Sequence, residues 1–390
     1  MENQFIKKIE FFIKHNTFFQ YTYRIVLSAF FRFLGIFVSC KRNTILFSSF
    51  SGKSFNDSPK AIYDELLKRK EFSDYDYVWA FEKPDLFTLP KGRKVQINSL
   101  KYFIIALGAK YWIANVNIER GLKFKKKTTR FLHTGHGTGP QLCGNAVKGR
   151  KFYDYSNVNF MCADGPFIKE VFVRDFKANP NNFLMCGRPR EDELFSLSDE
   201  DKSRFKQQFK IPNDKKIILY APTWRDDYYN PKNKDFNVIP INLQIWEKEL
   251  SNDYVIIFRA HSQSIIKNKF SFNSFFTDGS NYPYINHQIA IADIVISDYS
   301  SLLWDAALIK KPIVSFAYDY DNYASTRGLY FDMRSEFPGG VVENEQQLIE
   351  RILKFNFERE TQHSIALKEK FITRDSSSAT NTCIEALFSK

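Results

Sequence analysis

A histidine in a glycine-rich turn is one place where this sequence could carry out chemistry. His136 follows an apolar run and stands among Gly135, Gly137 and Thr138. Glycines let the backbone approach a ligand closely and aim successive N–H groups at phosphate oxygens. An imidazole has a pKa that suits proton transfer near neutral pH, although a single histidine is also common as a structural residue. The turn therefore predicts a phosphate-handling site with a proton carrier, set against a purely structural alternative.

Arginine and histidine side chains follow two apolar runs in the second half of the chain. Thr223 and Arg225 come after one run, and Arg259 and His261 come after another. A guanidinium group recognises phosphate through planar, bidentate hydrogen bonds. Because His261, like His136, is delivered by the end of a predicted strand, we expect both rings to face one cleft. A surface Arg–Asp pair is the alternative interpretation of Arg225.

Residues 291–332 are predicted to form one βαβ unit of a parallel sheet. A β-branched apolar run ends at a polar turn with Ser300 and Ser301, a helix is predicted over 302–309, and a second strand over 313–316. In such units ligands bind beyond the carboxyl ends of the strands, where unpaired N–H groups of the next helix attract phosphate. The two serines would add hydroxyl donors. An ordinary helix cap would use the same residue types.

Charged side chains accompany this unit. Asp298 precedes the two serines, Asp305 lies in the predicted helix, and Asp319 and Arg327 follow the second strand. Carboxylates and ring hydroxyls at these positions would suit the hydroxyl groups of a ligand, and the guanidinium would contact phosphate. Asp305 would equally suit the second turn of a helix with its side chain in solvent. The segment as a whole indicates a phosphorylated, hydroxyl-bearing ligand.

The bulk composition limits the class of protein. The chain has 390 residues, 44% of them hydrophobic, and alternates predicted strands and helices, which indicates a parallel α/β protein with two domains and an extension. A formal net charge of +12 favours an anionic partner, and no recognisable nucleic-acid-binding module accompanies it. The five cysteines have no paired spacing, so the sequence predicts neither a zinc site nor a disulfide framework. These features fit a reducing, cytoplasmic compartment.

Residues 1–42 differ from the rest of the chain. Apolar and aromatic residues recur there at helical spacing, with lysines and arginines between them. The most apolar run, residues 25–40, is short for a bilayer span and holds Arg32 near its middle. No small-residue cleavage site follows, so a signal peptide is not predicted. We expect a helical anchor on an anionic membrane surface, aromatic on one face and basic on the other; a spanning helix and packing on the protein's own core are the alternatives.

Several segments carry motifs that occur together in one enzyme family. They are residues 297–332 (SDYSSLLWDAALIKKPIVSFAYDYDNYASTRGLYFD), 221–227 (APTWRDD), 259–261 (RAH), 187–192 (GRPRED) and 136–138 (HGT). Together these segments resemble the CDP-glycerol glycerophosphotransferases, the primases and polymerases of teichoic-acid synthesis and their relatives in capsule synthesis. Gly135 stands where that family usually has tryptophan, and residues 139–141 replace its usual proline, leucine and lysine.

The resemblance implies a GT-B architecture, in which two facing doubly wound domains hold the active site between them. Residues 43–205 would form the acceptor domain and 206–365 the donor domain, preceded by the membrane-associating segment 1–42. Residues 366–390 would form a helix that packs back on the first domain. The oligomeric state is left open.

The implied reaction transfers glycerol phosphate, or a related polyol phosphate, from CDP-glycerol or CDP-ribitol to a hydroxyl group, and CMP leaves. The acceptor would be an undecaprenyl-linked saccharide or polyol phosphate, met by a peripheral enzyme at the cytoplasmic face of the membrane. Neither a metal nor a bound cofactor is required by this reading. Primase and polymerase activity, and teichoic acid and capsule as products, remain alternatives.

The resemblance also implies roles for the residues named above. His136 would be the general base and His261 would protonate or steady the leaving phosphate, and the two roles could be exchanged. Donor phosphates would be bound by Thr223, Arg225, Arg259, Ser300, Ser301 and Arg327, and hydroxyl groups by Asp298, Asp305 and Asp319. Two other functions remain open: a non-catalytic relative that binds anionic polymer or lipid, and a GT-B transferase that uses a nucleotide sugar.

Overall fold

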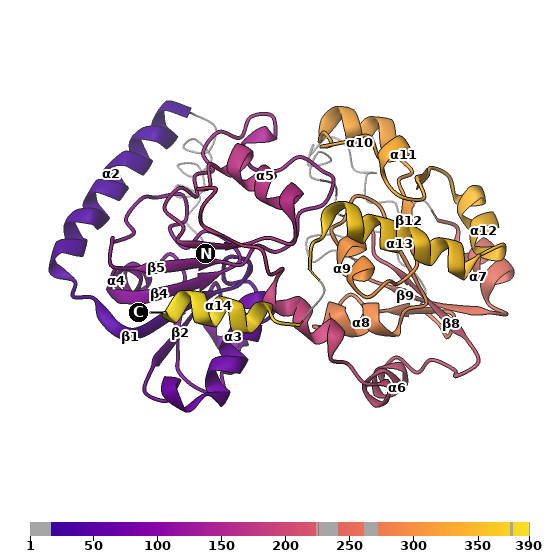
Figure 1. Cartoon of the computed structure of the whole chain (residues 1–390), viewed down its shortest axis with the longest axis horizontal. Helices are drawn as coiled ribbons and strands as arrows, with labels where there is room; N and C mark the ends of the chain where they lie inside the picture. Colours follow the sequence, from indigo (N-terminus) through magenta and orange to yellow (C-terminus); the bar gives the residue numbers. More distant parts are fainter. Residues whose placement is uncertain (1–16, 224, 226–240, 261–271, 375–376, 390) are drawn as a thin grey trace, which may run out of the picture.

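The computed structural model describes residues 17–223, 225, 241–260, 272–374 and 377–389. Within this part of the chain, two parallel sheets lie in two halves of the molecule, each covered by helices (Figure 1). The predicted α/β class is therefore confirmed. The predicted βαβ unit is also present, because β11 (Ile294–Ser297) and β12 (Ile313–Phe316) pair in parallel and α9 (Leu302–Leu308) connects them.

The first sheet has the strand order β3-β2-β1-β4-β5-β6-β7. Its strands are β1 (Lys41–Ser48), β2 (Asp76–Phe81), β3 (Arg93–Gln96), β4 (Ala109–Ala114), β5 (Arg130–His133), β6 (Phe160–Cys162) and β7 (Phe183–Leu184). One face packs against α2 (Thr17–Phe37), α4 (Leu100–Gly108) and α5 (Pro166–Phe176). The other face packs against α3 (Asp57–Lys68) and the C-terminal helix α14 (Ala379–Phe388).

The second sheet has the strand order β10-β9-β8-β11-β12-β13. Its remaining strands are β8 (Lys216–Tyr220), β9 (Tyr254–Phe258), β10 (Phe276–Asp278) and β13 (Val341–Val342). Its remaining helices are α6 (Asp199–Gln208), α7 (Leu243–Leu250), α8 (Ile285–Ile291), α10 (Tyr320–Thr326), α11 (Met333–Glu336), α12 (Glu345–Leu353) and α13 (Phe357–Phe371). A 3-10 segment, η5 (Pro189–Phe195), precedes α6.

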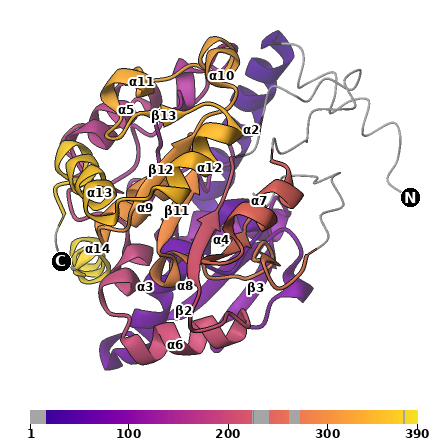
Figure 2. The same cartoon turned by 90° about the vertical axis from the view of Figure 1, so that its right-hand side faces the viewer.

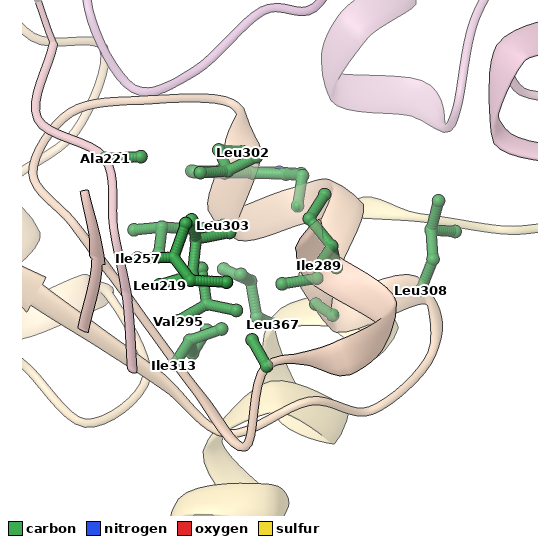
Figure 3. Close-up of a cluster of buried hydrophobic side chains, with 14 of the residues drawn as sticks. Leu219, Ala221, Ile257, Ile289, Val295, Leu302, Leu303, Leu308, Ile313 and Leu367 are labelled. Atoms are coloured by element: carbon green, nitrogen blue, oxygen red, sulfur yellow. The ribbon is translucent and has the colours of Figure 1, made fainter. Parts of the chain in front are cut away.

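Alternation along the strands divides each core into two layers. In β8, Ile217 and Leu219 enter the layer under α8, α9 and α13, whereas Ile218 and Tyr220 enter the layer under α7 and α12. Figure 3 shows the first of these layers, and Figure 2 shows α9 and α13 on one side of β11 with α7 on the other. Each large apolar side chain buried in this way contributes about 1.5–3 kcal/mol. Burial on both faces explains why the strands are nearly continuous apolar runs.

Helix α2 lies on the first domain and leaves one of its faces uncovered. Phe31 stacks on Phe103 of α4 with ring centroids 4.2 Å apart. Arg24 lies over the ring of Phe152, and the Nε–H of Arg32 donates to the carbonyl of Lys123 at 2.7 Å. Both arginines of α2 therefore contact the first domain, which differs from the predicted division into an aromatic and a basic face. Residues 1–16 lie outside the described part of the chain.

The uncovered face of α2 is strongly apolar. Nine of the eighteen large hydrophobic side chains that are exposed in the described part of the chain lie on this helix: Phe19, Tyr21, Tyr23, Ile25, Val26, Phe30, Phe33, Ile36 and Phe37. No helix among the described residues combines the length and the apolar character that crossing a bilayer requires.

Candidate active site where the two domains meet

Loops that follow strands of the two sheets are bonded to each other. Gln141, in the loop after β5, forms an antiparallel bridge with Leu329, which follows α10. The N–H of Tyr330 donates to the carbonyl of Pro140 at 2.7 Å. The segment that contains Arg327 is thereby attached to the glycine-rich turn of the first domain.

The glycine-rich turn also contacts the start of α9. A Cβ atom on Gly137 would lie 2.2 Å from the Oγ of Ser301, and one on Gly139 would lie 2.6 Å from the carbonyl oxygen of Tyr299. Gly137 has a φ of +112°, which side chains rarely adopt. Thr138, between the two glycines, is half-buried. Glycine is therefore needed here because the two domains approach closely, in addition to any contact with a ligand.

One hydrogen bond fixes the tautomer of His136. Its Nδ1 lies 3.1 Å from the carbonyl oxygen of Asn115, at the end of β4. Because a carbonyl oxygen can only accept, Nδ1 carries the proton and Nε2 has a lone pair. The ring also contacts Phe50 edge-on, with centroids 5.7 Å apart. No described residue forms a hydrogen bond with Nε2, so this atom is available to accept a proton.

The surroundings of His136 lower its pKa below the ordinary value of 6.5. The side chain is accessible to solvent, but the protein around it displaces much of the water, and this desolvation is the largest cause. Arg190 and Arg188 lower the pKa further, whereas the bond to Asn115 and the carboxylate of Asp57 raise it. The imidazole is therefore neutral at pH 7, which is the form that a general base requires.

The predicted phosphate-binding and hydroxyl-binding residues of the second domain bind one another. Arg225 donates from Nη1 to Asp298 at 2.8 Å, and from Nε and Nη2 to Asp319 at 2.8 and 2.9 Å. Thr223 donates from its hydroxyl group to Asp298 at 2.6 Å, and the hydroxyl of Tyr299 donates to Asp319 at 3.0 Å. Arg225 and Asp298 are 7% and 1% exposed, so this cluster is part of the interior of the second domain.

These contacts keep Arg225 charged. Burial alone would lower its pKa, but Asp298 and Asp319 outweigh that effect and raise it. Three tyrosine rings also lie about its guanidinium group, at 5.0 to 5.2 Å from the ring centroids: Tyr299, Tyr318 and Tyr323. A ligand phosphate at this position would have to share the guanidinium with two carboxylates.

Arg259 is held differently from Arg225. Its Nη1 donates to three neutral oxygens, the carbonyls of Gly279 and Tyr282 and the Oε1 of Gln288, at 2.7 to 3.1 Å. Among the described residues it forms no ion pair with a carboxylate. Burial lowers its pKa to about 10, so it remains charged at pH 7. This uncompensated positive charge at the end of β9 is suited to an anionic ligand. His261 lies outside the described residues.

Ser300 and Ser301 begin α9 as predicted. The Oγ of Ser300 accepts from the N–H of Leu302 at 3.1 Å, which is an ordinary capping contact. Ser301 is the N-cap residue, and its side chain makes no capping hydrogen bond. Arg327 follows α10 directly, next to Gly328. Ser301 and the glycine-rich turn are thus brought together. The expectation that His136 and His261 face one cleft stays a prediction.

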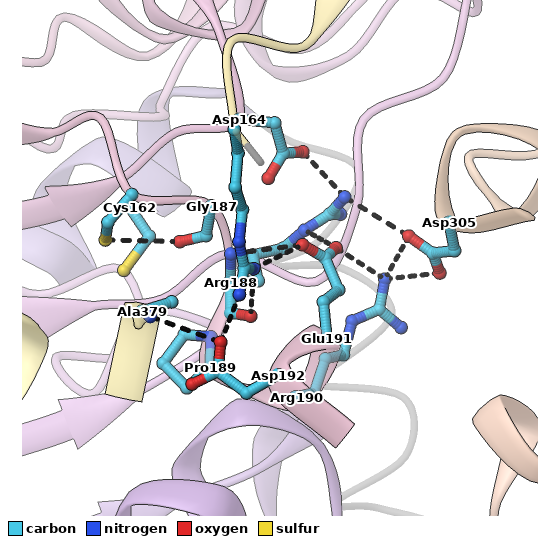
Figure 4. A network of polar contacts seen from close by, with 12 residues as sticks. Cys162, Asp164, Gly187, Arg188, Pro189, Arg190, Glu191, Asp192, Asp305 and Ala379 are labelled. Carbon is cyan, nitrogen blue, oxygen red and sulfur yellow. Dashed lines mark hydrogen bonds and ion pairs between the residues drawn. The ribbon is translucent and has the colours of Figure 1, made fainter. Parts of the chain in front are cut away.

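Asp305 lies in a buried ion-pair network between the domains (Figure 4). Its Oδ2 is 2.7 Å from Nη2 of Arg190, and its Oδ1 is 3.3 Å from Nη2 of Arg188. Arg188 also pairs with Asp164 at 2.6 Å. The solvent-facing alternative for Asp305 is wrong, because the residue is 2% exposed. Its carboxylate is occupied by two guanidinium groups, so the structure gives it an interdomain role in place of the predicted hydroxyl contact.

Two groups of residues form contacts between the domains that the sequence did not predict. Arg188 and Arg190 were visible in the motif at 187–192, but the motif alone does not say that they meet an aspartate of the other domain. Tyr330 donates from its hydroxyl to Asp175 of α5 at 2.7 Å and accepts from the N–H of Cys143 at 3.2 Å. No local spacing connects positions so far apart in the sequence.

Comparisons with known proteins identify the proteins to which this chain is similar. The family model described as CDP-Glycerol:Poly(glycerophosphate) glycerophosphotransferase matches residues 29–389. A teichoic acid poly(glycerol phosphate) polymerase from Staphylococcus epidermidis is 33% identical over 77% of this chain, which spans only 44% of that protein's length. A teichoic acid glycerol-phosphate transferase from Staphylococcus aureus is 31% identical over 80% of this chain and 83% of its own length. A poly(ribitol-phosphate) polymerase from Bacillus spizizenii also matches, at 26% identity over 92% of this chain and 56% of its own length.

A solved structure supports the same assignment. The wall teichoic acid polymerase TagF has a TM-score of 0.80 and 29% sequence identity, with 93% of this chain and 94% of the other covered. A further TagF structure of similar likeness, with a TM-score of 0.78, was obtained from a variant soaked with CDPG. The sequence match and the structural match each cover most of the chain, and both point to the same family. The chain belongs to the CDP-glycerol glycerophosphotransferase family.

Proposed function

We propose that the protein transfers glycerol phosphate from CDP-glycerol to a hydroxyl group of a lipid-linked acceptor in teichoic-acid or capsular polymer synthesis. In this reaction the acceptor oxygen forms a bond to the phosphorus that carries glycerol. The bond from that phosphorus to the CMP phosphate breaks, and CMP leaves. The observation that carries the proposal is the neutral His136, with a free Nε2, in the turn where the two domains of a family member meet.

In this proposal the first domain supplies the base. His136 accepts the proton of the acceptor hydroxyl at Nε2, and Asn115 holds the ring through Nδ1. The N–H groups of Gly137 and Thr138 line the same turn. The architecture would be of the GT-B kind, with donor and acceptor meeting between residues 43–205 and 206–365.

The second domain supplies positive charge for the diphosphate. Arg259 has no carboxylate partner among the described residues, and Ser301 stands at the start of α9 facing the glycine-rich turn. Arg327 and His261 complete the proposed donor contacts. Thr223, Arg225, Asp298 and Asp319 form a hydrogen-bonded frame, and its outer oxygens are the candidates for hydroxyl contacts. Stabilising charge on the transferring phosphate is the main catalytic requirement of such reactions.

The central test measures CMP release from CDP-glycerol with a lipid-linked acceptor. His136→Ala should reduce kcat by about 10²–10⁴-fold while CDP-glycerol still binds, because general-base catalysis contributes that factor. His363→Ala, which removes a histidine paired with Glu360 on α13, is the matched control and should retain activity. CDP-ribitol serves as the competing donor. Donor binding without CMP release in the wild type would favour the non-catalytic alternative, and activity with a nucleotide sugar alone would contradict the proposal.

The acceptor would be reached at the membrane surface by way of α2. Its uncovered face offers aromatic and aliphatic side chains, and the net charge of +12 favours anionic lipid. The double substitution Phe33→Glu and Ile36→Glu should abolish sedimentation with anionic vesicles. Leu86→Glu, at a similarly exposed position away from α2, is the control. Equal binding by both variants would show that this face is not the anchor.

A further inference from the structure

Three cysteines that are far apart in the sequence meet on one face of the first sheet. Cys162 ends β6, Cys186 follows β7, and Cys383 lies in α14. The sulfur atoms of Cys162 and Cys383 are 3.3 Å apart, and all three sulfurs lie within 4.8 Å of one another. Cys162 and Cys383 are buried, and Cys186 is half-buried. The sequence predicted no zinc site because its cysteines have no paired spacing. The fold nevertheless brings three of them together.

The separation of these sulfur atoms suits a common metal ion. Zinc binds thiolate sulfur at about 2.3 Å, which puts two sulfurs on one ion about 4 Å apart. Thiolate ligands select soft or borderline ions such as Zn²⁺ over Mg²⁺ or Ca²⁺. No fourth Cys, His, Asp or Glu ligand joins the three within the described residues. The half-buried Cys186 gives access from solvent, so a water molecule would fill a fourth position.

A basic side chain lies beside the cluster. A Cβ atom on Gly187, the residue after Cys186, would lie 2.4 Å from the Cδ of Arg374. Arg374 is itself 4% exposed and pairs with Glu191 at 3.2 Å. A metal ion with three thiolates would carry one net negative charge, and Arg374 is a basic side chain beside it.

We propose that Cys162, Cys186 and Cys383 form a binding site for one thiophilic metal ion of the Zn²⁺ class. The site lies outside the cleft that contains His136 and does not depend on the transferase function. It would connect α14 to the first sheet and to the turn at 187–192, which carries the interdomain arginines. Its expected effect is structural: the metal would fasten the C-terminal helix to the first domain.

The test is a titration of the reduced full-length protein with Co²⁺ under anaerobic conditions. We expect a thiolate-to-cobalt charge-transfer absorption that saturates at one equivalent and disappears when Zn²⁺ is added. Cys186→Ser and Cys383→Ser should each abolish the strong absorption, whereas Cys40→Ser, a cysteine outside the cluster, should retain it. No absorption in the wild type, or an unchanged absorption in Cys186→Ser, would overturn the proposal.

A second measurement needs only the wild type, in case a variant fails to fold. Zn²⁺ should protect the three clustered thiols from alkylation and leave Cys40 reactive, as read by peptide mass spectrometry. At a free Zn²⁺ concentration ten times Kd, hydrogen exchange in α14 should slow about tenfold if release of the helix requires loss of the metal. Equal alkylation with and without Zn²⁺, or a Cys162–Cys383 disulfide in the reduced preparation, would contradict the metal site.

Discussion

The turn around His136 and the cluster around Arg225 hold their polar side chains in opposite ways. His136 has one hydrogen bond to the protein, at Nδ1, and its Nε2 is left without a partner among the described residues. Arg225 donates to two carboxylates and is almost completely buried. Both residues follow strands and both belong to motifs of the family. A motif residue can thus keep a free polar atom, as His136 does, or be fully engaged in holding its neighbours in place, as Arg225 is.

The largest effect is expected on the stability of the protein, when the frame around Arg225 is broken. Arg225→Ala should lower the free energy of unfolding by about 3–5 kcal/mol, because it removes the guanidinium group that pairs with the carboxylates of Asp298 and Asp319. Urea denaturation measures this. Arg334→Ala is the control, since that arginine also pairs with two carboxylates, Asp321 and Glu343, but at the surface, and little change is expected. Equal losses in the two variants would remove the distinction between frame and reacting group.

A smaller effect is expected where the turn meets α9. Gly137→Ala should destabilise the protein by about 1–3 kcal/mol, because its Cβ would overlap the Oγ of Ser301 in an already tight contact. Gly135→Ala is a matched control in the same turn. Its φ is +63° and nothing lies within 4 Å of an added Cβ, so a loss of only about 1 kcal/mol is expected. Thermal unfolding of both variants tests whether the two loops are in contact.

His133 should make the stability of the protein depend on pH. His133 is buried, and burial lowers its pKa to about 3. In the unfolded chain this group binds a proton near pH 6.5, so stability should fall as the pH drops below 6.5, by about 1.4 kcal/mol per pH unit at most. His133→Phe keeps an aromatic ring beside Tyr155 and should remove this part of the pH dependence. An identical pH dependence in wild type and variant would show that His133 is protonated in the folded protein.

The smallest effect is a displacement of the pH–activity profile. Because the pKa of His136 is lowered, the acidic limb of kcat/KM for CMP release should lie below pH 6.5. Asp57→Asn should move the limb further down, since the carboxylate of Asp57 raises the pKa of His136. A limb above pH 6.5 would mean that another group, or a protonated His136, governs the reaction.

Much of the fold could be predicted from the sequence. Both sheets are buried on both faces, so their central strands are recognisable as continuous apolar runs. The runs at β8, β9 and β12 have the residue bounds expected from their apolar content. The edge strands β3, β7, β10 and β13 were not predicted, because runs of two to four residues are too short to show a period.

The site was predictable in its residue types but less so in their partners. Sequence motifs placed His136 and Ser301 in turns after strands, and the structure brings those turns together. The pairing of Asp305 with Arg190 could not be predicted, because it depends on how the two domains are set against each other. The cysteine cluster was missed for the same reason, since α14 returns to a sheet formed more than 200 residues earlier in the chain.

The return of the C-terminal segment also has a mechanical consequence. The polypeptide passes between the domains twice, through η5 into α6 and again between α13 and α14. The two passages are bonded to each other: Arg374 of the second donates to the carbonyl of Arg188 at 3.1 Å and pairs with Glu191 beside the first. The two crossings are therefore coupled, and a displacement of one domain against the other would move both of them together. Such a displacement would also have to break the buried pairs between Asp305 and the two arginines.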